Sequence, residues 1–115
     1  MLDWLFGRKS VMEWEGVTFR EGDRVVTRHS EETTMKPSET GHRGEVLMGD
    51  GKVGEVVKKS TEGKNLVVVK FRAQKWQEAG RRRHGKEIGE FVELRSFAAT
   101  IHVDYVCHDP TEPRR

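Results

Sequence analysis

Residues 66–72 read LVVVKFR, and the alternation within this stretch decides the fold class. Successive side chains of an extended strand point to opposite faces, so Val67, Val69 and Phe71 share one face. The other face mixes apolar and basic side chains. This pattern predicts a strand with one buried side, and Val69, in its middle, is expected to be among the most buried residues of the chain.

The composition around this stretch favours strands over helices. Val occurs 14 times, against 5 Leu, 2 Ile and 4 Ala, and the chain holds 12 Gly. Val suits a pleated, half-buried surface, whereas Ala and Leu lead the helix-forming residues. Alternating runs separated by glycine-containing turns predict further strands at 24–29, 44–48, 53–59, 90–96 and 101–107. Because Asp-Gly at 50–51 is typical of a type I′ turn, residues 44–48 and 53–59 are expected to form a hairpin.

Three other segments depart from the strand pattern. Residues 73–79, AQKWQEA, have a helix-forming composition and precede Gly80, which predicts one short helix inserted around 73–80. Residues 97–100 are expected to make a single turn. Residues 30–42 are polar and contain a proline, so they are expected to form a long, mobile loop.

Four short motifs resemble those of the SH3-like small β-barrels. They are FREGDRVV at 19–26, GEV at 44–46, the Val-rich strand at 66–71 and VDYV at 103–106. The resemblance implies a mainly β domain, a small barrel of five to six antiparallel strands, over residues 20–108. It concerns the fold rather than the function.

A chain of 115 residues is long enough for one domain and too short for two. Residues 1–19 are expected to be a flexible N-terminal extension, whose aromatics form a lead-in strand or a flap, and 109–115 a disordered tail. No apolar run has the length of a membrane helix, and Asp3 stands where a signal peptide is basic. Cys107 is the only cysteine, which excludes an intrachain disulfide. These features predict a cytoplasmic protein with no membrane partner.

The charge distribution supplies the functional hypothesis. The net charge is +2, but residues 58–86 hold 10 Lys and Arg against 2 Glu, while 10–57 and 87–109 carry an acidic excess. Lys and Arg bind phosphates, an exposed Trp76 would stack on an unpaired base, and 81–85 would be a flexible basic loop. The candidate nucleic-acid-binding residues of this basic band are Lys58, Lys59, Lys70, Arg72, Lys75, Trp76, Arg81, Arg82, Arg83 and Lys86.

The sequence therefore predicts a non-catalytic binding module that contacts RNA or DNA. An alternative is a protein-interaction or self-associating module without nucleic acid, such as a homodimer that pairs the basic band with the acidic flanks. A third alternative is an oligomeric barrel of the plasmid-type (type II) dihydrofolate reductases, which the FREGDRV at 19–25 also resembles. Their later Val-Gln-Ile-Tyr motif has no match here, since the nearest stretch is IHVDY at 101–105.

No motif of the chain predicts catalysis. GDGKVG at 49–54 matches the dinucleotide-binding G-x-G-x-x-G, but a strand pattern follows it where a helix is required. Cys107 and His108 would point to opposite faces of a strand, which disfavours a thiol–imidazole pair. His102, Asp104 and His108 fit either a metal site or an ordinary solvated face. We therefore expect no catalytic residue, no metal and no cofactor.

Overall fold

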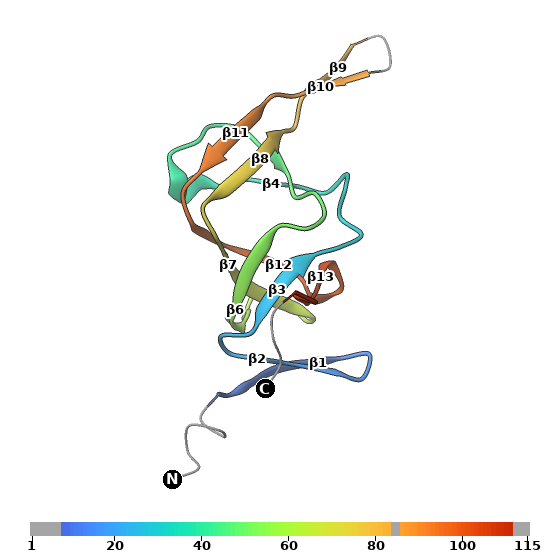
Figure 1. Ribbon diagram of the computed structural model, residues 1–115, viewed down its shortest axis with the longest axis vertical. Coiled ribbons are helices and arrows are strands. Elements are labelled where there is room, and N and C mark those ends of the chain that lie inside the picture. Colours follow the sequence, from blue (N-terminus) through green and yellow to red (C-terminus); the bar gives the residue numbers. More distant parts are fainter. Residues whose placement is uncertain (1–7, 84–85, 112–115) are drawn as a thin grey trace.

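The structure is a computed structural model that describes residues 8–83 and 86–111, with the backbone alone at 81–83 and 86–88. The described residues form antiparallel strands and two single turns of 3-10 helix, η1 (Ser38–Thr40) and η2 (Val103–Tyr105). The predicted mainly β, antiparallel domain is confirmed. Figure 1 shows a central body with a hairpin of β1 (Ser10–Trp14) and β2 (Val17–Arg20) at one end, and a hairpin of β9 (Arg81–Arg83) and β10 (Lys86–Ile88) at the other. Within the described ranges, no helix is long and apolar enough to cross a membrane.

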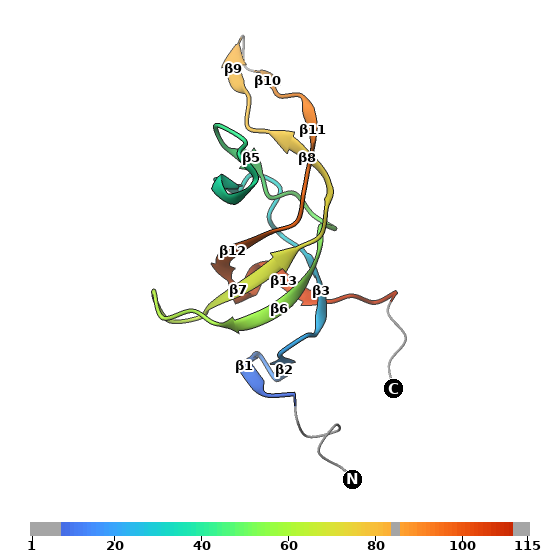
Figure 2. The ribbon, with the colours of Figure 1, turned by 90° about the vertical axis from the view of Figure 1, so that its left-hand side faces the viewer.

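A five-stranded antiparallel sheet forms the body, in the order β12-β7-β6-β3-β13. Its strands are β3 (Arg24–Thr27), β6 (Val53–Lys59), β7 (Leu66–Phe71), β12 (Phe97–His102) and β13 (Val106–His108). The two edge strands, β12 and β13, are consecutive in the chain and are joined only by η2. Because so short a link connects the two edges, the sheet has to curl, and β6 and β7 are visibly bent in Figure 2.

The core lies on the concave side of this sheet, where the alternation of β7 predicted it. Val67, Val69 and Phe71 are 1%, 0% and 0% exposed, which confirms Val69 as one of the most buried residues. Neighbouring strands add buried side chains to the same cluster: Val25, Val56, Phe97, Ile101 and Val106. The burial of apolar surface from five strands is the main stabilising contribution to this body.

The helix predicted around 73–80 is wrong, because this segment is strand β8 (Gln74–Glu78). It lies in a four-stranded sheet of order β11-β8-β5-β4, with β11 (Phe91–Leu94), β5 (Val46–Leu47) and β4 (Thr34–Met35). The side chain of Gln74 fixes the start of β8, since it accepts from the Val53 N–H at 3.0 Å and donates to the Val53 carbonyl at 2.9 Å. Local propensity for helix or strand is weak, so pairing with two neighbouring strands decides the conformation of this segment.

The hairpin predicted between 44–48 and 53–59 is also wrong. A tight turn is present, but it is not of type I′, because positive φ occurs at Gly49 and Gly51 and not at Asp50. Moreover, β5 joins the four-stranded sheet while β6 joins the five-stranded one. Hydrogen bonds to Thr27, rather than pairing of β5 with β6, hold the turn in position. Its hydroxyl donates to the Gly49 carbonyl at 2.6 Å and accepts from the Lys52 N–H at 2.9 Å.

Two expectations for the C-terminal third need correction. Residues 97–100 are not a turn but the first part of β12, in which Phe97 pairs with Phe71 of β7. The strand predicted at 101–107 is interrupted by η2. His102 caps this 3-10 turn, because its Nδ1 accepts the Asp104 N–H at 3.0 Å. This side chain-to-backbone hydrogen bond competes with strand pairing and ends β12.

The loop expected at 30–42 contains regular structure. It forms the two-residue strand β4 and the turn η1, and Pro37 between them is fully buried. Gly41 ends η1 in the left-handed conformation, with φ of 80°. The segment is therefore folded against the four-stranded sheet and β12.

The predicted N-terminal extension contains a hairpin of β1 (Ser10–Trp14) and β2 (Val17–Arg20). Glu15 and Gly16 between them have φ of 50° and 78°, the positive values that a type I′ turn requires. Met12 and Phe19 are 8% and 3% exposed, and both belong to the core cluster. The chain is thus packed on the body from β1 onward, whereas 1–7 and the end of the predicted tail, 112–115, lie outside the described residues.

Candidate nucleic-acid interface

A ribbon that begins as β8 and β11 in the four-stranded sheet and continues as the hairpin β9–β10 carries half of the ten Lys and Arg of the basic band. Strands β8 and β11 pair from Gln74–Leu94 to Gln77–Phe91, and the chain continues into β9 (Arg81–Arg83) and β10 (Lys86–Ile88), which pair with each other. The outer part of this ribbon, β9–β10, projects from the body in both Figure 1 and Figure 2. The basic loop expected at 81–85 is therefore corrected to strand β9 at its first three residues, and 84–85 lie outside the described residues.

Glycine and backbone hydrogen bonds fix the point where the ribbon leaves the body. The Glu78 N–H donates to the Glu90 carbonyl at 2.7 Å, and the Ala79 N–H donates to the Glu45 carbonyl at 3.0 Å. A Cβ on Gly89 would overlap the Glu78 carbonyl oxygen, so only glycine permits this approach of the two strands. The two strands are consequently bonded to each other at the base of the ribbon, and the Ala79 N–H ties that base to the body.

The register of the tip brings basic positions opposite one another. Arg83 pairs with Lys86, Arg82 with Glu87 and Arg81 with Ile88. Four of the six paired positions of this hairpin are therefore cationic residues.

Phe91 is an exposed aromatic residue at the base of the ribbon. Its side chain is 63% exposed, and the Nζ of Lys75 lies 6.0 Å from its ring centroid. Lys75 and Phe91 share the outward face of the β8–β11 pair with Gln77 and Glu93. The sequence analysis missed Phe91, although the inward positions of Val92 and Leu94 already implied that residue 91 faces outward.

Trp76 is not the stacking platform that the sequence predicted. It is fully buried, and its ring centroid lies 5.1 Å from that of Phe71 and 5.3 Å from that of Phe97. Its position in β8 alternates with the exposed Lys75, so the pairing of β8 turns the indole into the core. Trp76 is a packing residue of the domain.

The remaining basic residues divide between the ribbon and the body. Lys75 lies on the ribbon, and Arg72 is exposed just before it, between β7 and β8. Lys70 lies on the outer face of β7 beside Glu55 of β6, which offsets its charge. The other exposed lysines of the band, Lys58 and Lys59, end β6 on the body. The structure therefore places Lys75 and the tip along one ribbon, with Arg72 just before it, and leaves the β6 lysines on the body.

Lys52 stiffens the base of the ribbon. Its Nζ donates to the Lys75 carbonyl at 2.7 Å and lies 5.4 Å from the Trp76 ring centroid. Burial disfavours the charged form and lowers the pKa of Lys52 below its ordinary value. The ammonium group therefore has a structural role, since it ties the β5–β6 turn to β8.

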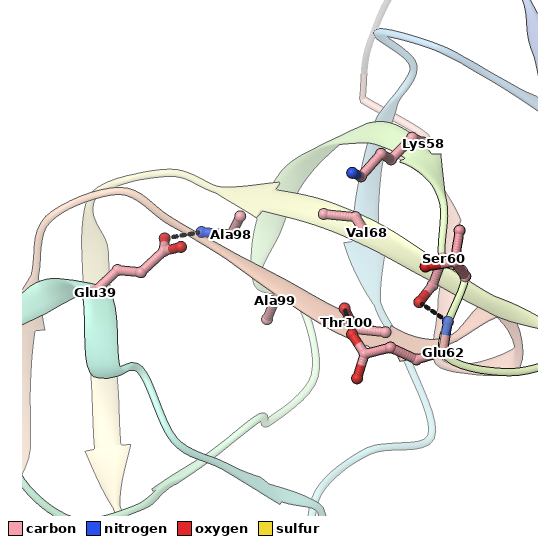
Figure 3. Close-up of a pocket in the computed structure, with 9 residues that line it drawn as sticks. Glu39, Lys58, Ser60, Glu62, Val68, Ala98, Ala99 and Thr100 are labelled. Carbon is pink, nitrogen blue, oxygen red and sulfur yellow. Dashed lines mark hydrogen bonds between the residues drawn. The ribbon is translucent and has the colours of Figure 1, made fainter.

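An acidic hollow of about 260 Å³ lies beside β12, on the body (Figure 3). The Glu39 carboxylate accepts the Ala98 N–H at 3.1 Å, and the Thr100 hydroxyl donates to the Glu62 carboxylate at 3.3 Å. The Glu39 carboxylate thus occupies an N–H group on the open edge of β12, where another strand would pair, whereas Glu62 and Lys58 line the hollow over the outer face of the sheet. Charged side chains at an edge oppose edge-to-edge association.

His102, at the end of β12, and His108, at the end of β13, bind different groups. The Nδ1 of His102 accepts the Asp104 N–H, while the Nε2 of His108 lies 2.8 Å from Asp23. Across residues 8–83 and 86–111, no three His, Cys, Asp or Glu side chains are grouped so that they could hold a metal ion.

Comparisons with protein-family models, with curated proteins and with solved structures found no match to this chain. The function is therefore inferred from the charge, exposure and geometry of the ribbon.

Proposed function

We propose that this chain is a non-catalytic nucleic-acid-binding module that binds phosphates with the β9–β10 tip and stacks an unpaired base on Phe91. The observation that carries the proposal is the ribbon itself. Its β9–β10 tip stands away from the body, this tip pairs the strand Arg81–Arg83 with the strand that begins at Lys86, and a 63% exposed phenylalanine lies at the base of the ribbon. A protruding ribbon reaches a polyanion without bringing the acidic parts of the body against it.

The pairing of charge with an aromatic ring favours a single strand as the ligand. Lys and Arg contacts to phosphates supply sequence-independent affinity, which falls as salt rises because condensed counterions are released. Stacking of a base on an aromatic side chain requires that the base is unpaired. Phe91 and Lys75 would hold a base and its phosphate together, and the tip would hold the phosphates that follow.

We also infer that the body is an SH3-like barrel, as the resemblance of its motifs implies. The antiparallel order of five strands and the short link between the two edge strands support this inference. A fold of this kind is a scaffold for binding and does not specify the ligand.

We infer a cytoplasmic location for the module. The lone, half-buried Cys107 supports it, because a thiol that has no disulfide partner in its own chain suits a reducing compartment. Localisation of a tagged full-length chain tests this inference, and recovery outside the cytoplasm would contradict it.

The test of the function is fluorescence anisotropy with labelled single-stranded RNA, single-stranded DNA and duplex DNA of about 12 nucleotides, a length within the site sizes of small modules. Replacing Arg81, Arg82 and Arg83 by Ala should weaken every ligand, and each lost contact to a single strand should lower the salt slope by about 0.7. Phe91→Ala should weaken the single strands by about 1–3 kcal/mol and spare the duplex. Phe91→Tyr, which keeps an aromatic ring, is the matched control.

A second control separates the ribbon from the body. Lys64 is exposed in the turn between β6 and β7. Replacing Lys58, Lys59 and Lys64 by Ala therefore removes the same charge from the body and should leave the affinity nearly unchanged. Equal weakening by the two triple variants would show that net charge, rather than the ribbon, binds nucleic acid. No binding in low salt, together with a dimer that persists in high salt, would instead favour the self-associating module.

A further inference from the structure

The exposed ring of Phe91 has a polar side chain on each of two sides. Gln77 of β8 lies directly opposite it, and Glu93 follows two positions along β11, on the same outward face. The Glu78 N–H donates to the Glu90 carbonyl, so the next pair along, Gln77 with Phe91, is a non-hydrogen-bonded pair. The side chains of such a pair lie close together, with Cβ atoms about 4.5–5.5 Å apart. The amide of Gln77 is therefore within reach of a base that stacks on the ring.

The described structure uses neither of these polar groups internally. Across residues 8–83 and 86–111, no hydrogen bond or ion pair engages the Gln77 amide or the Glu93 carboxylate. Glu93 is exposed and Gln77 is half-buried. Lys75 lies directly opposite Glu93, but its ammonium group is near the Phe91 ring, 6.0 Å from the centroid. The amide and the carboxylate thus remain available to a ligand on the ring.

The two polar groups differ in the hydrogen bonds that they can form. An ionised carboxylate only accepts, so Glu93 binds amino groups and repels carbonyl oxygens and phosphates. Cytosine and adenine carry exocyclic amino groups at N4 and N6, whereas thymine, and uracil with it, has the O4 carbonyl at the corresponding position. An amide both donates and accepts, and it can turn to suit either kind of base. Glu93 therefore discriminates between bases, while Gln77 adds affinity for all of them.

The surroundings of the ring favour one orientation of a stacked nucleotide. Along β11, Glu93 lies on the side of the body, and its charge disfavours a phosphate there. Toward the tip, the two strands continue through Gly89 and Ala79, which carry no side chain and a methyl group. The phosphates consequently lie near Lys75 and the tip, and the far edge of the base faces Glu93.

We propose that this face selects cytosine and adenine over uracil and thymine, with the Glu93 carboxylate accepting a hydrogen bond from the exocyclic amino group. The inference rests on the proposed nucleic-acid function and adds a base preference to it. Phosphate contacts do not read sequence, and they are common to all single strands. The ratio of affinities for two strands should therefore stay constant as salt rises, although each affinity falls.

Fluorescence anisotropy of the full chain with labelled RNAs of about 12 nucleotides, one of cytosine alone and one of uracil alone, tests the preference. These bases have the same ring size and differ at the group that faces Glu93. The cytosine strand should bind at least about fivefold more tightly at every salt concentration, and an adenine strand should bind at least as tightly as the cytosine strand.

Three variants locate the preference on this face. Glu93→Gln should bring the ratio of cytosine to uracil affinity toward one, because an amide serves either base. Glu90→Gln is the matched control: this exposed residue precedes Phe91, lies on the other face by alternation and carries the same charge, so the ratio should not change. Gln77→Leu should weaken both strands by the same factor.

The outcomes separate this inference from the function on which it rests. Equal binding of the cytosine and uracil strands, with an affinity that still depends on Phe91, would overturn the base preference and leave the proposed function standing. No binding of either strand in low salt would overturn both. A preference that persists in Glu93→Gln, or that falls equally in Glu90→Gln, would overturn the role of Glu93. Circular dichroism verifies the fold of each variant, and the comparison of strands on the unaltered chain depends on no variant.

Discussion

Within the five-stranded sheet, Gly54 is a position where packing leaves no room for an added atom. It lies in the central strand β6, paired with Val25 of β3 and Phe71 of β7. A Cβ at this position would lie 2.6 Å from Val69 Cγ1, 2.9 Å from the Lys70 carbonyl oxygen and 3.3 Å from a Phe71 ring carbon. Gly54→Ala therefore forces β6 and β7 apart at their most buried contact.

The size of the effect follows from two opposing contributions. Overpacking of a well-packed core costs about 1–3 kcal/mol, and here the obstacles are a backbone carbonyl and fully buried side chains, which places the cost near the upper end. Replacing glycine in a strand recovers about 0.4–1 kcal/mol through the entropy of the unfolded chain. The expected net loss is about 2 kcal/mol. With an unfolding entropy of about 2.1 cal/mol/K per residue, this loss lowers the Tm of a chain of this length by roughly 8 °C.

Urea and thermal unfolding, followed by circular dichroism and tryptophan fluorescence, measure this loss. Gly63→Ala is the matched control, because that glycine is in an exposed turn and its added Cβ would meet only the end of the Leu66 side chain, at 3.1 Å. The control should stay within about 0.5 kcal/mol of the parent chain. A Gly54→Ala variant as stable as the control would refute the close approach of β6 to β7.

Two further predictions concern the core and the C-terminal segment. Val69→Ala should destabilise the domain by about 1–3 kcal/mol through lost burial and the remaining cavity, and an unchanged urea midpoint would contradict its place in the core. Hydrogen bonds from the Thr111 hydroxyl and N–H, together with Arg24, lower the pKa of Asp109. Because the folded pKa lies below the unfolded value of about 3.9, the stabilisation from Asp109 is present above that pH and is lost as the pH falls through the folded pKa. Asp109→Asn should therefore reduce the acid sensitivity of the urea midpoint below about pH 4, and an unchanged profile would exclude this contribution.

The candidate interface was predictable in part. A dense run of Arg and Lys between two strand patterns identified the region, because charge density is a property of the sequence itself. The choice of aromatic residue was wrong, since Trp76 and Phe91 differ in the face they occupy rather than in local composition. Alternation around Val92 and Leu94 placed Phe91 on the outside, but the helix expected at 73–80 concealed the strand that pairs with it.

The sequence by itself determined the class of the fold and the buried face of β7. When one face of a strand must be buried, alternation in a segment such as LVVVKF allows only one choice of the buried face. A shift by one residue would expose the apolar side chains that are now buried. Only the tertiary structure decided which strands pair. The sequence of the tight turn at 49–52 is compatible both with a closed hairpin and with a connection between two sheets. The hydroxyl of Thr27, distant in sequence, forms hydrogen bonds that stabilise the second arrangement. Likewise AQKWQEA became a strand because β5 and β11 flank it, Gln74 is bonded to Val53, and the core accepts the indole of Trp76. Those contacts join residues far apart in the chain, so no local pattern encodes them.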